Sequence, residues 1–175
     1  AYVDFGAKSA LELIEKYDNL LVVQTFSKSR SMAGMRIGFA CGHPQLISFL
    51  NDVKYSFNSY TMDQTALDLG VASIEDQAYF EETLHKIIQT RERVKLRLTE
   101  LGFTFRDSRS NFIFASHKSC PAEELFEKLK EKDIYVRYFN KPRIHNYLRI
   151  TIGTDAEMDE FLSEVENYLK ESGRL

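Results

Sequence analysis

The stretch that decides the fold of this chain is residues 20–41, LLVVQTFSKSRSMAGMRIGFAC. It opens with an apolar run at 20–23, which is long enough for a buried strand and too short for a helix. It closes with a second strand-like run at 37–41, and the polar loop between the runs contains Lys28 and Gly34. The stretch therefore predicts two strands joined by a loop that holds a lysine at the end of a buried strand.

Lys28 is the candidate nucleophile of this loop. Arg30 and Arg36 would favour its neutral form by like-charge repulsion, and desolvation would act in the same direction. A neutral lysine can attack a carbonyl carbon and form a Schiff base. A polar loop on a crossover connection is the alternative interpretation, and on the pattern alone it is the commoner one.

Composition limits the class of protein. The sequence has 175 residues, of which 43% are hydrophobic and 28% charged, and its formal net charge is −3. These values suit one or two small globular domains with a real core. Charges of both signs are mixed throughout, so we expect no nucleic-acid partner and no membrane surface, and no apolar run approaches the length of a membrane span.

Cysteines and histidines give no metal-binding pattern. Cys41 and Cys120 lie far apart and match no zinc spacing, and the four histidines are scattered. Cys41 lies in an apolar strand and is expected to be a buried thiol. We therefore expect no metal site and a reduced, cytoplasmic setting.

Hydrophobic periodicity predicts a strand, a short helix and a strand at 2–5, 9–17 and 20–25. This order is a βαβ crossover, which implies parallel pairing. Helices are then expected from residue 44 to about 53, from 61 or 63 to about 73, and from 76 to 101, with an aromatic-rich loop at 54–60. An apolar face of the first of these helices is marked by Leu46, Ile47, Leu50 and Val53. The second is expected to be buried through Ala66, Leu67, Leu69 and Val71.

The pattern changes after the long helix, whose charges are expected to form a solvated outer face and which Gly102 ends. Strands are predicted at 103–106, 111–115, 134–139 and 147–152, and helices begin at Pro121 and Asp155. The fold class is thus α/β: a partial doubly wound, mostly parallel sheet in residues 1–85, followed by a small α+β domain in 86–175. The boundary is expected inside the long helix.

Arg137 and Arg149 form a second candidate cluster, because each lies on an otherwise apolar strand. An arginine in that setting costs free energy unless its charge is compensated, and its fork of donors suits a carboxylate or a phosphate. An ion pair with an acidic side chain is the alternative for either arginine alone. Two such arginines, together with the Lys28 loop, favour the ligand interpretation.

The segment TFSK at 25–28, followed eight positions later by Arg36, resembles the pyridoxal-phosphate lysine segment of fold-type I aminotransferases. Within that superfamily it is most similar to the histidinol-phosphate aminotransferase group. The segment LRITIG at 148–153 is similar to the strand with which the family grips the anionic end of its substrate. The resemblance covers essentially the whole chain.

The resemblance implies pyridoxal 5'-phosphate as cofactor. Lys28 would be the catalytic residue, forming a Schiff base with the cofactor and then serving as general base and acid. Tyr2 would bind the phenolic oxygen of the cofactor. Ser27 and Arg36 would hold its phosphate, and Thr25 would supply a further hydroxyl.

The resemblance also implies the substrates. Arg149 would bind the anionic end of the substrate, Arg137 the phosphate of histidinol phosphate, and Asn111 would face the site from the hinge side. The amino donor would be a small molecule such as histidinol phosphate, paired with a 2-oxo acid, 2-oxoglutarate, and yielding glutamate. A homodimer is implied as well.

The chain departs from the family pattern in one respect. The glycine-rich phosphate loop, the aspartate that protonates the pyridine nitrogen, the aromatic stacked on the ring and the asparagine beside the phenolic oxygen all precede Tyr2 in the family, and none can be assigned. The resemblance is thus to the C-terminal half of an aminotransferase, and these residues alone are expected to be a poor catalyst. Open alternatives are another fold-type I enzyme, such as an aromatic aminotransferase or a phospho-amino-acid decarboxylase, and a non-catalytic sensor module.

Overall fold

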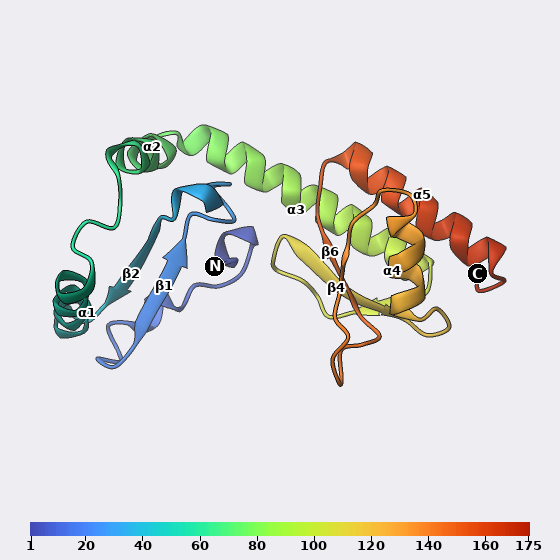
Figure 1. The fold of residues 1–175 in the computed structure, drawn as a ribbon, viewed down its shortest axis with the longest axis horizontal. Coiled ribbons are helices and arrows are strands. Elements are labelled where there is room, and N and C mark those ends of the chain that lie inside the picture. Colours follow the sequence, from blue (N-terminus) through green and yellow to red (C-terminus); the bar gives the residue numbers. More distant parts are fainter. The chain divides into compact units, whose positions relative to one another are not determined.

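The computed structural model describes residues 1–175, and they divide into two compact units, Ala1–Leu84 and His85–Leu175 (Figure 1). The division falls within the longest helix, α3 (Gln77–Glu100), which supplies residues to both units. The assignment of 1–85 and 86–175 to two domains of a larger enzyme stays a prediction.

The first unit is built on a two-stranded antiparallel sheet. Strand β1 (Leu21–Thr25) pairs with β2 (Gly38–Gly42), with Leu21 opposite Gly42 and Thr25 opposite Gly38. These are the two strands predicted on either side of the Lys28 loop. The remaining elements of the unit are 3-10 helices at Val3–Phe5, Ala10–Leu13 and Ala33–Met35, and the helices α1 (Pro44–Phe57) and α2 (Gln64–Glu75).

The predicted βαβ crossover with parallel pairing is wrong. Val3–Phe5 is a 3-10 turn closed by Gly6 at φ 103°, and within 9–17 only Ala10–Leu13 is helical. The run at 2–5 does not pair as a strand because its backbone N–H groups close this turn, with Phe5 and Gly6 donating to the carbonyls of Tyr2 and Val3. The pairing of β1 is instead with the strand that follows it, and every strand pair in the chain is antiparallel.

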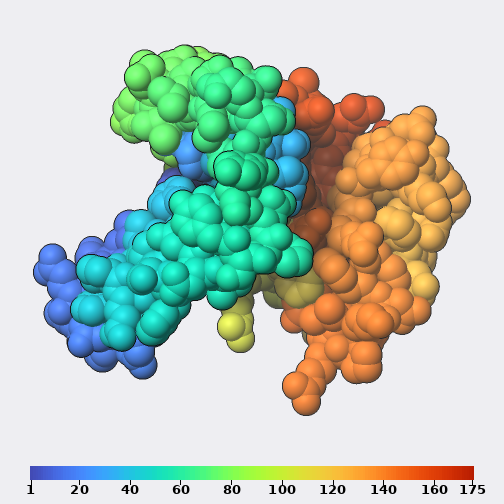
Figure 2. Space-filling view, turned by 60° about the vertical axis from the view of Figure 1, so that its left-hand side comes forward, coloured from blue at the N-terminus to red at the C-terminus, as the bar shows by residue number.

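The helices of the first unit leave most of their apolar side chains exposed. Helix α1 has no buried residue, and α2 buries only Ala66 and Gly70. The predicted burial of Leu67, Leu69 and Val71 is therefore wrong, and Leu50 and Val53 on the apolar face of α1 are exposed as well. A periodic pattern marks an apolar face without showing what covers it. Figure 2 shows α1 and the segment after it, coloured cyan to green, at the near surface of this unit.

The predicted loop at 54–60 is partly helical. Helix α1 continues to Phe57, and the N–H of Asn58 donates to the carbonyl of Lys54 at 2.8 Å. Phe57 and Tyr60 are 91% and 93% exposed, so their aromatic rings add nothing to the core of the unit. The next helix begins as predicted, because the carboxylate of Asp63 accepts the N–H of Ala66 at 2.7 Å.

The second unit is a four-stranded antiparallel sheet with three helices. The strand order is β3-β4-β6-β5, and helix α5 begins with a capping box of Thr154 and Glu157. The strand predicted at 134–139 is shorter than expected, since only Arg137–Tyr138 pairs. The bounds are β3 Phe103–Phe105, β4 Phe112–His117, α4 Ala122–Lys130, β5 Arg137–Tyr138, β6 Leu148–Thr151 and α5 Asp155–Glu171.

The core of the second unit lies against one face of this sheet. Along β4 the side chains alternate, with Ile113, Ala115 and His117 buried and those between them partly exposed. Each fully buried aliphatic side chain contributes about 1.5–3 kcal/mol relative to exposure. The buried cluster combines sheet residues Ile113, Ala115, Leu148 and Ile150 with helix residues Val94, Leu98, Leu125, Leu129, Phe161, Val165 and Leu169.

Gly102 turns the chain from α3 into β3 at a φ of 84°, and a Cβ there would lie 2.9 Å from Nε2 of His117. We expect Gly102→Ala to lower the free energy of unfolding by about 1–3 kcal/mol, through backbone strain and this clash. Gly173→Ala is the matched control, because Gly173 has a φ of 66° but open space around it. Urea unfolding measures both variants, and equal losses would contradict the role of the His117 contact.

His117 is buried as a neutral imidazole. Its Nε2–H donates to the Leu101 carbonyl at 3.1 Å, and its Nδ1 accepts the N–H of Ser119 at 3.3 Å. Burial lowers the pKa of His117 below its ordinary value of 6.5, although the bond to Leu101 acts in the opposite direction.

The unfolded chain therefore binds more protons than the folded chain just below pH 6.5. We expect the stability contributed by His117 to be complete above that pH and to decline as the pH falls toward the folded pKa. An NMR titration of the His117 ring, with urea unfolding at about pH 7.5 and about pH 5.5, measures this. A ring midpoint at or above 6.5 would show the predicted direction to be wrong.

Candidate functional site

The loop between β1 and β2 presents Lys28 to solvent. The carbonyl of Lys28 accepts the N–H of Ser31 at 3.2 Å, and the N–H of Met32 donates to the Phe26 carbonyl at 3.1 Å, so the loop is closed by its own backbone. The side chain of Lys28 is exposed and its amine has no hydrogen bond or ion pair. The amine is thus free to react at the end of β1.

The hydroxyl groups of Thr25 and Ser27 differ in their capacity to form a further hydrogen bond. Oγ1 of Thr25 donates to the Ile37 carbonyl at 3.2 Å and accepts both the N–H of Ser27 at 3.1 Å and its hydroxyl at 2.7 Å. One donor and two acceptor positions are all that a hydroxyl offers, so Thr25 is saturated. Ser27 can turn its O–H toward another acceptor at the cost of one hydrogen bond, and it is the hydroxyl of the pair that can reach an anion.

The two arginines of the loop have different surroundings. The guanidinium of Arg30 lies 4.0 Å from the ring centroid of Phe80 and 5.4 Å from that of Phe26, and it donates to the Ser73 carbonyl. Arg30 therefore ties the loop to α2 and α3, and the predicted effect of its charge on Lys28 stays a prediction. Arg36 is exposed at a φ of 56°, and its Nη1 donates to the Ala33 carbonyl at 2.6 Å.

Sequence reasoning missed Asp4. Its carboxylate accepts the side-chain amide of Gln24 at 2.9 and 3.0 Å and the hydroxyl of Ser29 at 2.5 Å. Ser29 is 5% exposed and directly follows Lys28, while Asp4 shares a 3-10 turn with Tyr2, whose carbonyl accepts the N–H of Phe5. The one available signal was a carboxylate placed between the apolar residues at 3 and 5, which a strand prediction leaves without a role.

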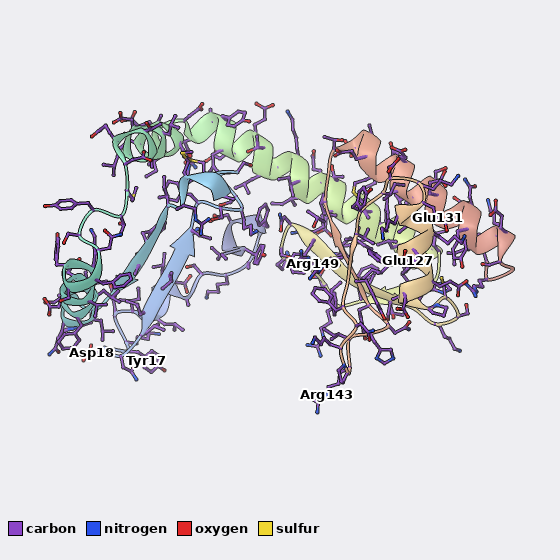
Figure 3. All side chains as sticks on the ribbon, in the orientation of Figure 1. Tyr17, Asp18, Glu127, Glu131, Arg143 and Arg149 are labelled. Atoms are coloured by element: carbon purple, nitrogen blue, oxygen red, sulfur yellow. The ribbon has the colours of Figure 1, made fainter.

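In the second unit the register of β5 and β6 sets Arg137 opposite Arg149. Like charges at directly opposed positions of a sheet destabilise the pairing. Both guanidinium groups lie beside the ring of Phe139, at 5.4 and 5.9 Å from its centroid, and Arg149 is also 5.7 Å from that of Phe112. Figure 3 shows Arg149 on the sheet and Arg143 at the tip of the loop that joins the two strands.

No carboxylate compensates these two arginines. Neither forms an ion pair, and Nε of Arg149 is buried without a hydrogen-bond partner. An unsatisfied buried donor on a cation is costly, and the ligand that would satisfy it is an anion. The alternative of two structural ion pairs therefore finds no acidic partner, and the ligand interpretation stays a prediction.

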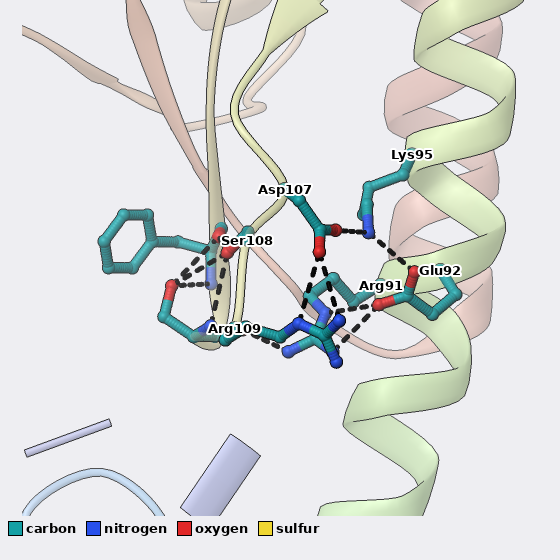
Figure 4. Close-up of polar contacts among 8 residues, drawn as sticks. Arg91, Glu92, Lys95, Asp107, Ser108 and Arg109 are labelled. Atoms are coloured by element: carbon teal, nitrogen blue, oxygen red, sulfur yellow. Dashed lines mark hydrogen bonds and ion pairs between the residues drawn. The ribbon is translucent and has the colours of Figure 1, made fainter. Parts of the chain in front are cut away.

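Asn111 immediately precedes β4, and its carbonyl accepts the N–H of Ile152 at 2.9 Å. The loop before it is held against α3 by a polar network (Figure 4). Lys95 of α3 bridges Glu92 and Asp107, and the hydrogen bond from Lys95 holds the pKa of Asp107 below its ordinary value. The hydroxyl of Ser108 donates to the Phe112 carbonyl at 2.5 Å, which closes the loop onto the strand.

Arg91 anchors the same network from inside the unit. It is 1% exposed, donates from Nη1 to the Ser110 carbonyl at 3.0 Å and pairs with Glu92 at 2.8 Å. The expected solvated outer face of α3 is therefore wrong at this position. Spacing could have shown it, because Arg91 lies three and seven residues before the buried Val94 and Leu98 and shares their face.

The predicted site residues fall into two groups. Tyr2, Thr25, Ser27, Lys28 and Arg36 lie in the first unit, around the β1–β2 loop, and Asn111, Arg137 and Arg149 lie in the second, at β4, β5 and β6. That the two groups face one ligand stays a prediction.

Two other kinds of site find no support. No group of three or more His, Cys, Asp or Glu side chains is placed to hold a metal ion. No helix combines the length and the apolar character needed to cross a membrane.

The sequence matches a known protein family over most of its length. The family model "Aminotransferase class I and II" matches residues 1–165. The chain therefore belongs to the class I and II aminotransferase family, and the predicted family is confirmed.

Particular relatives are more specific. The histidinol-phosphate aminotransferase of Brachyspira hyodysenteriae is 56% identical to this chain, over 97% of this chain and 48% of the relative. That of Lactococcus lactis subsp. lactis is 52% identical, over 98% of this chain and 48% of the relative. The solved histidinol-phosphate aminotransferase of Sinorhizobium meliloti has a similar fold, with a TM-score of 0.83 and 23% identity over 98% of this chain and 47% of that one. The chain spans about half the length of the curated relatives it matches.

Proposed function

We propose that this chain is part of a pyridoxal-phosphate-dependent aminotransferase that acts on histidinol phosphate and 2-oxoglutarate. The observation that carries the proposal is the unpaired amine of Lys28 at the end of β1, in a chain that belongs to the aminotransferase family. The relatives named histidinol-phosphate aminotransferase support the choice of substrate. A cytoplasmic homodimer, with no nucleic-acid or membrane partner, completes the proposal.

The residues of the first unit fit the cofactor. When bound, the cofactor would supply an electron sink for the amino group being transferred. Lys28 would bind its aldehyde carbon and then move a proton on the substrate carbon, Ser27 and Arg36 would hold its phosphate, and Tyr2 would donate to its phenolic oxygen. The saturated hydroxyl of Thr25 would orient Ser27 and make no contact of its own. The solved relative from Sinorhizobium meliloti is in complex with pyridoxal-5'-phosphate.

The second unit would supply the substrate site. Arg137 and Arg149 are opposed and uncompensated, so a phosphate between them would relieve their repulsion and satisfy Nε of Arg149. Asn111 would complete the site from the start of β4. Because the chain spans about half of its relatives, we expect catalysis from the full-length protein and little or none from residues 1–175 alone.

The first test is the position of the reactive lysine. Borohydride reduction of the full-length protein loaded with the cofactor should leave the pyridoxyl group on Lys28, as found by peptide mapping. Lys28→Ala should lower transamination by roughly a thousandfold or more, because nucleophile and proton carrier are lost together. Lys54→Ala, on the exposed helix α1, is the control and should keep full activity. An adduct on any other lysine would refute the assignment.

The second test concerns the arginine pair. We expect Arg137→Ala and Arg149→Ala each to lose about 2–5 kcal/mol of transition-state binding, as when one side of a buried charge pair is removed. The measurement is kcat/KM with histidinol phosphate and with histidinol, and the loss for Arg137→Ala should disappear with the unphosphorylated substrate.

Arg143→Asn is the control for this test. It removes a charge from the same loop at a φ of 71°, which asparagine tolerates, and it should leave the kinetics unchanged. Unchanged kinetics in Arg137→Ala would remove that residue from the site. If both alanine variants unfold, the two arginines are structural.

A further inference from the structure

We propose that Asp4 is a positioning residue that sets the geometry between Tyr2 and Lys28. The inference rests on the proposed function, because it concerns two side chains that would meet the same cofactor. Its basis is the position of one carboxylate between three segments of the first unit: the turn that holds Tyr2, strand β1, and the loop that holds Lys28.

The bond to Ser29 acts on Lys28. Ser29 is the next residue in the chain, and consecutive Cα atoms are about 3.8 Å apart across a planar peptide. The hydroxyl of Ser29 donates to Asp4 at 2.5 Å, and the residue is 5% exposed, so water does not readily replace this acceptor. A fixed Ser29 therefore fixes the peptide plane between residues 28 and 29, which contains the Cα atom that carries the Lys28 side chain.

The same carboxylate acts on Tyr2 through its own turn. The N–H groups of Phe5 and Gly6 donate to the carbonyls of Tyr2 and Val3 at 3.1 and 3.2 Å, so the turn around Asp4 is closed. Phe5 is 0% exposed and anchors this turn in the unit. Gln24 of β1 donates to both carboxylate oxygens, which holds the turn against the strand that leads to Lys28.

Other contacts of the loop lead elsewhere. The backbone bonds of Ser31 and Met32 close the loop on itself, and Arg30 connects it to the Ser73 carbonyl and the Phe80 ring. The Ser29–Asp4 bond reaches the turn with Tyr2. Loss of this bond would leave the fold of the loop intact and change its position relative to Tyr2.

The test uses the full-length protein loaded with pyridoxal phosphate and the variants Asp4→Ala, Asp4→Asn and Ser29→Ala. The readouts are the pH midpoint of the visible absorption of the bound cofactor, and kcat and KM. We expect Asp4→Ala to shift the midpoint by about half a pH unit or more and to lower kcat about tenfold with KM within about twofold, because misplacement of a reacting group costs rate.

Asp4→Asn should restore most of both values, since its amide oxygen can still accept the Ser29 hydroxyl. If Asp4→Ala acted only by loss of fold, Asp4→Asn would not restore the pH midpoint of the cofactor absorption in this way. The double variant Asp4→Ala/Ser29→Ala should be no worse than the stronger single variant, because both substitutions remove the same bond. Asp18→Asn is the control: Asp18 is exposed near the start of β1 (Figure 3) and should leave both readouts unchanged.

An unchanged midpoint and kcat in Asp4→Ala, or additive losses in the double variant, would overturn the inference. If Asp4→Ala does not fold, Ser29→Ala tests the inference by the same pH midpoint, kcat and KM, because it removes only the hydroxyl that donates to Asp4. Failure of the proposed function is distinguishable, since the unsubstituted protein would then show neither visible absorption nor a borohydride adduct on Lys28.

Discussion

The alternation of side chains along β4 is the constraint on which the second unit depends. Ile113 and Ala115 face the helices, so their neighbours must face the other way, and the antiparallel register then extends that choice to β6 and β5. Phe114 lies opposite Arg149, which lies opposite Arg137. The same pleat that buries the core thus gathers two guanidinium groups on the open face of the sheet.

The first unit is organised differently, because polar contacts and not a large core hold its reactive loop. Helix α1 buries no side chain, and Val23 on β1 is 65% exposed. The loop is instead fixed by a saturated hydroxyl at Thr25, by the stacking of Arg30 on Phe80 and by the Asp4 carboxylate. Hydrogen bonds have preferred distances and angles, so contacts of this kind help to hold a side chain in one geometry.

The sequence predicts those features that depend on local signals. The two strands around Lys28, the helix start at Asp63 and the glycine turn at Gly102 follow from propensity, capping and backbone conformation. The parallel crossover was wrong because the pairing partner of a strand is a long-range property that its own residues do not encode. Asp4 was missed for the same reason, since its partners lie 20 and 25 residues away. Arg91 could have been found from its spacing to Val94.

The pairing of Arg137 with Arg149 has a consequence for the edge of the sheet. Strand β5 has two residues and one neighbour, so the repulsion between the guanidinium groups acts where the sheet is held most weakly. An anion that bridged them, as proposed, would bind the paired strands more tightly than separated ones, and linkage would then require it to strengthen the pairing by the same free energy. Binding of an anion at the two arginines and pairing of β5 with β6 would therefore be two measures of one equilibrium.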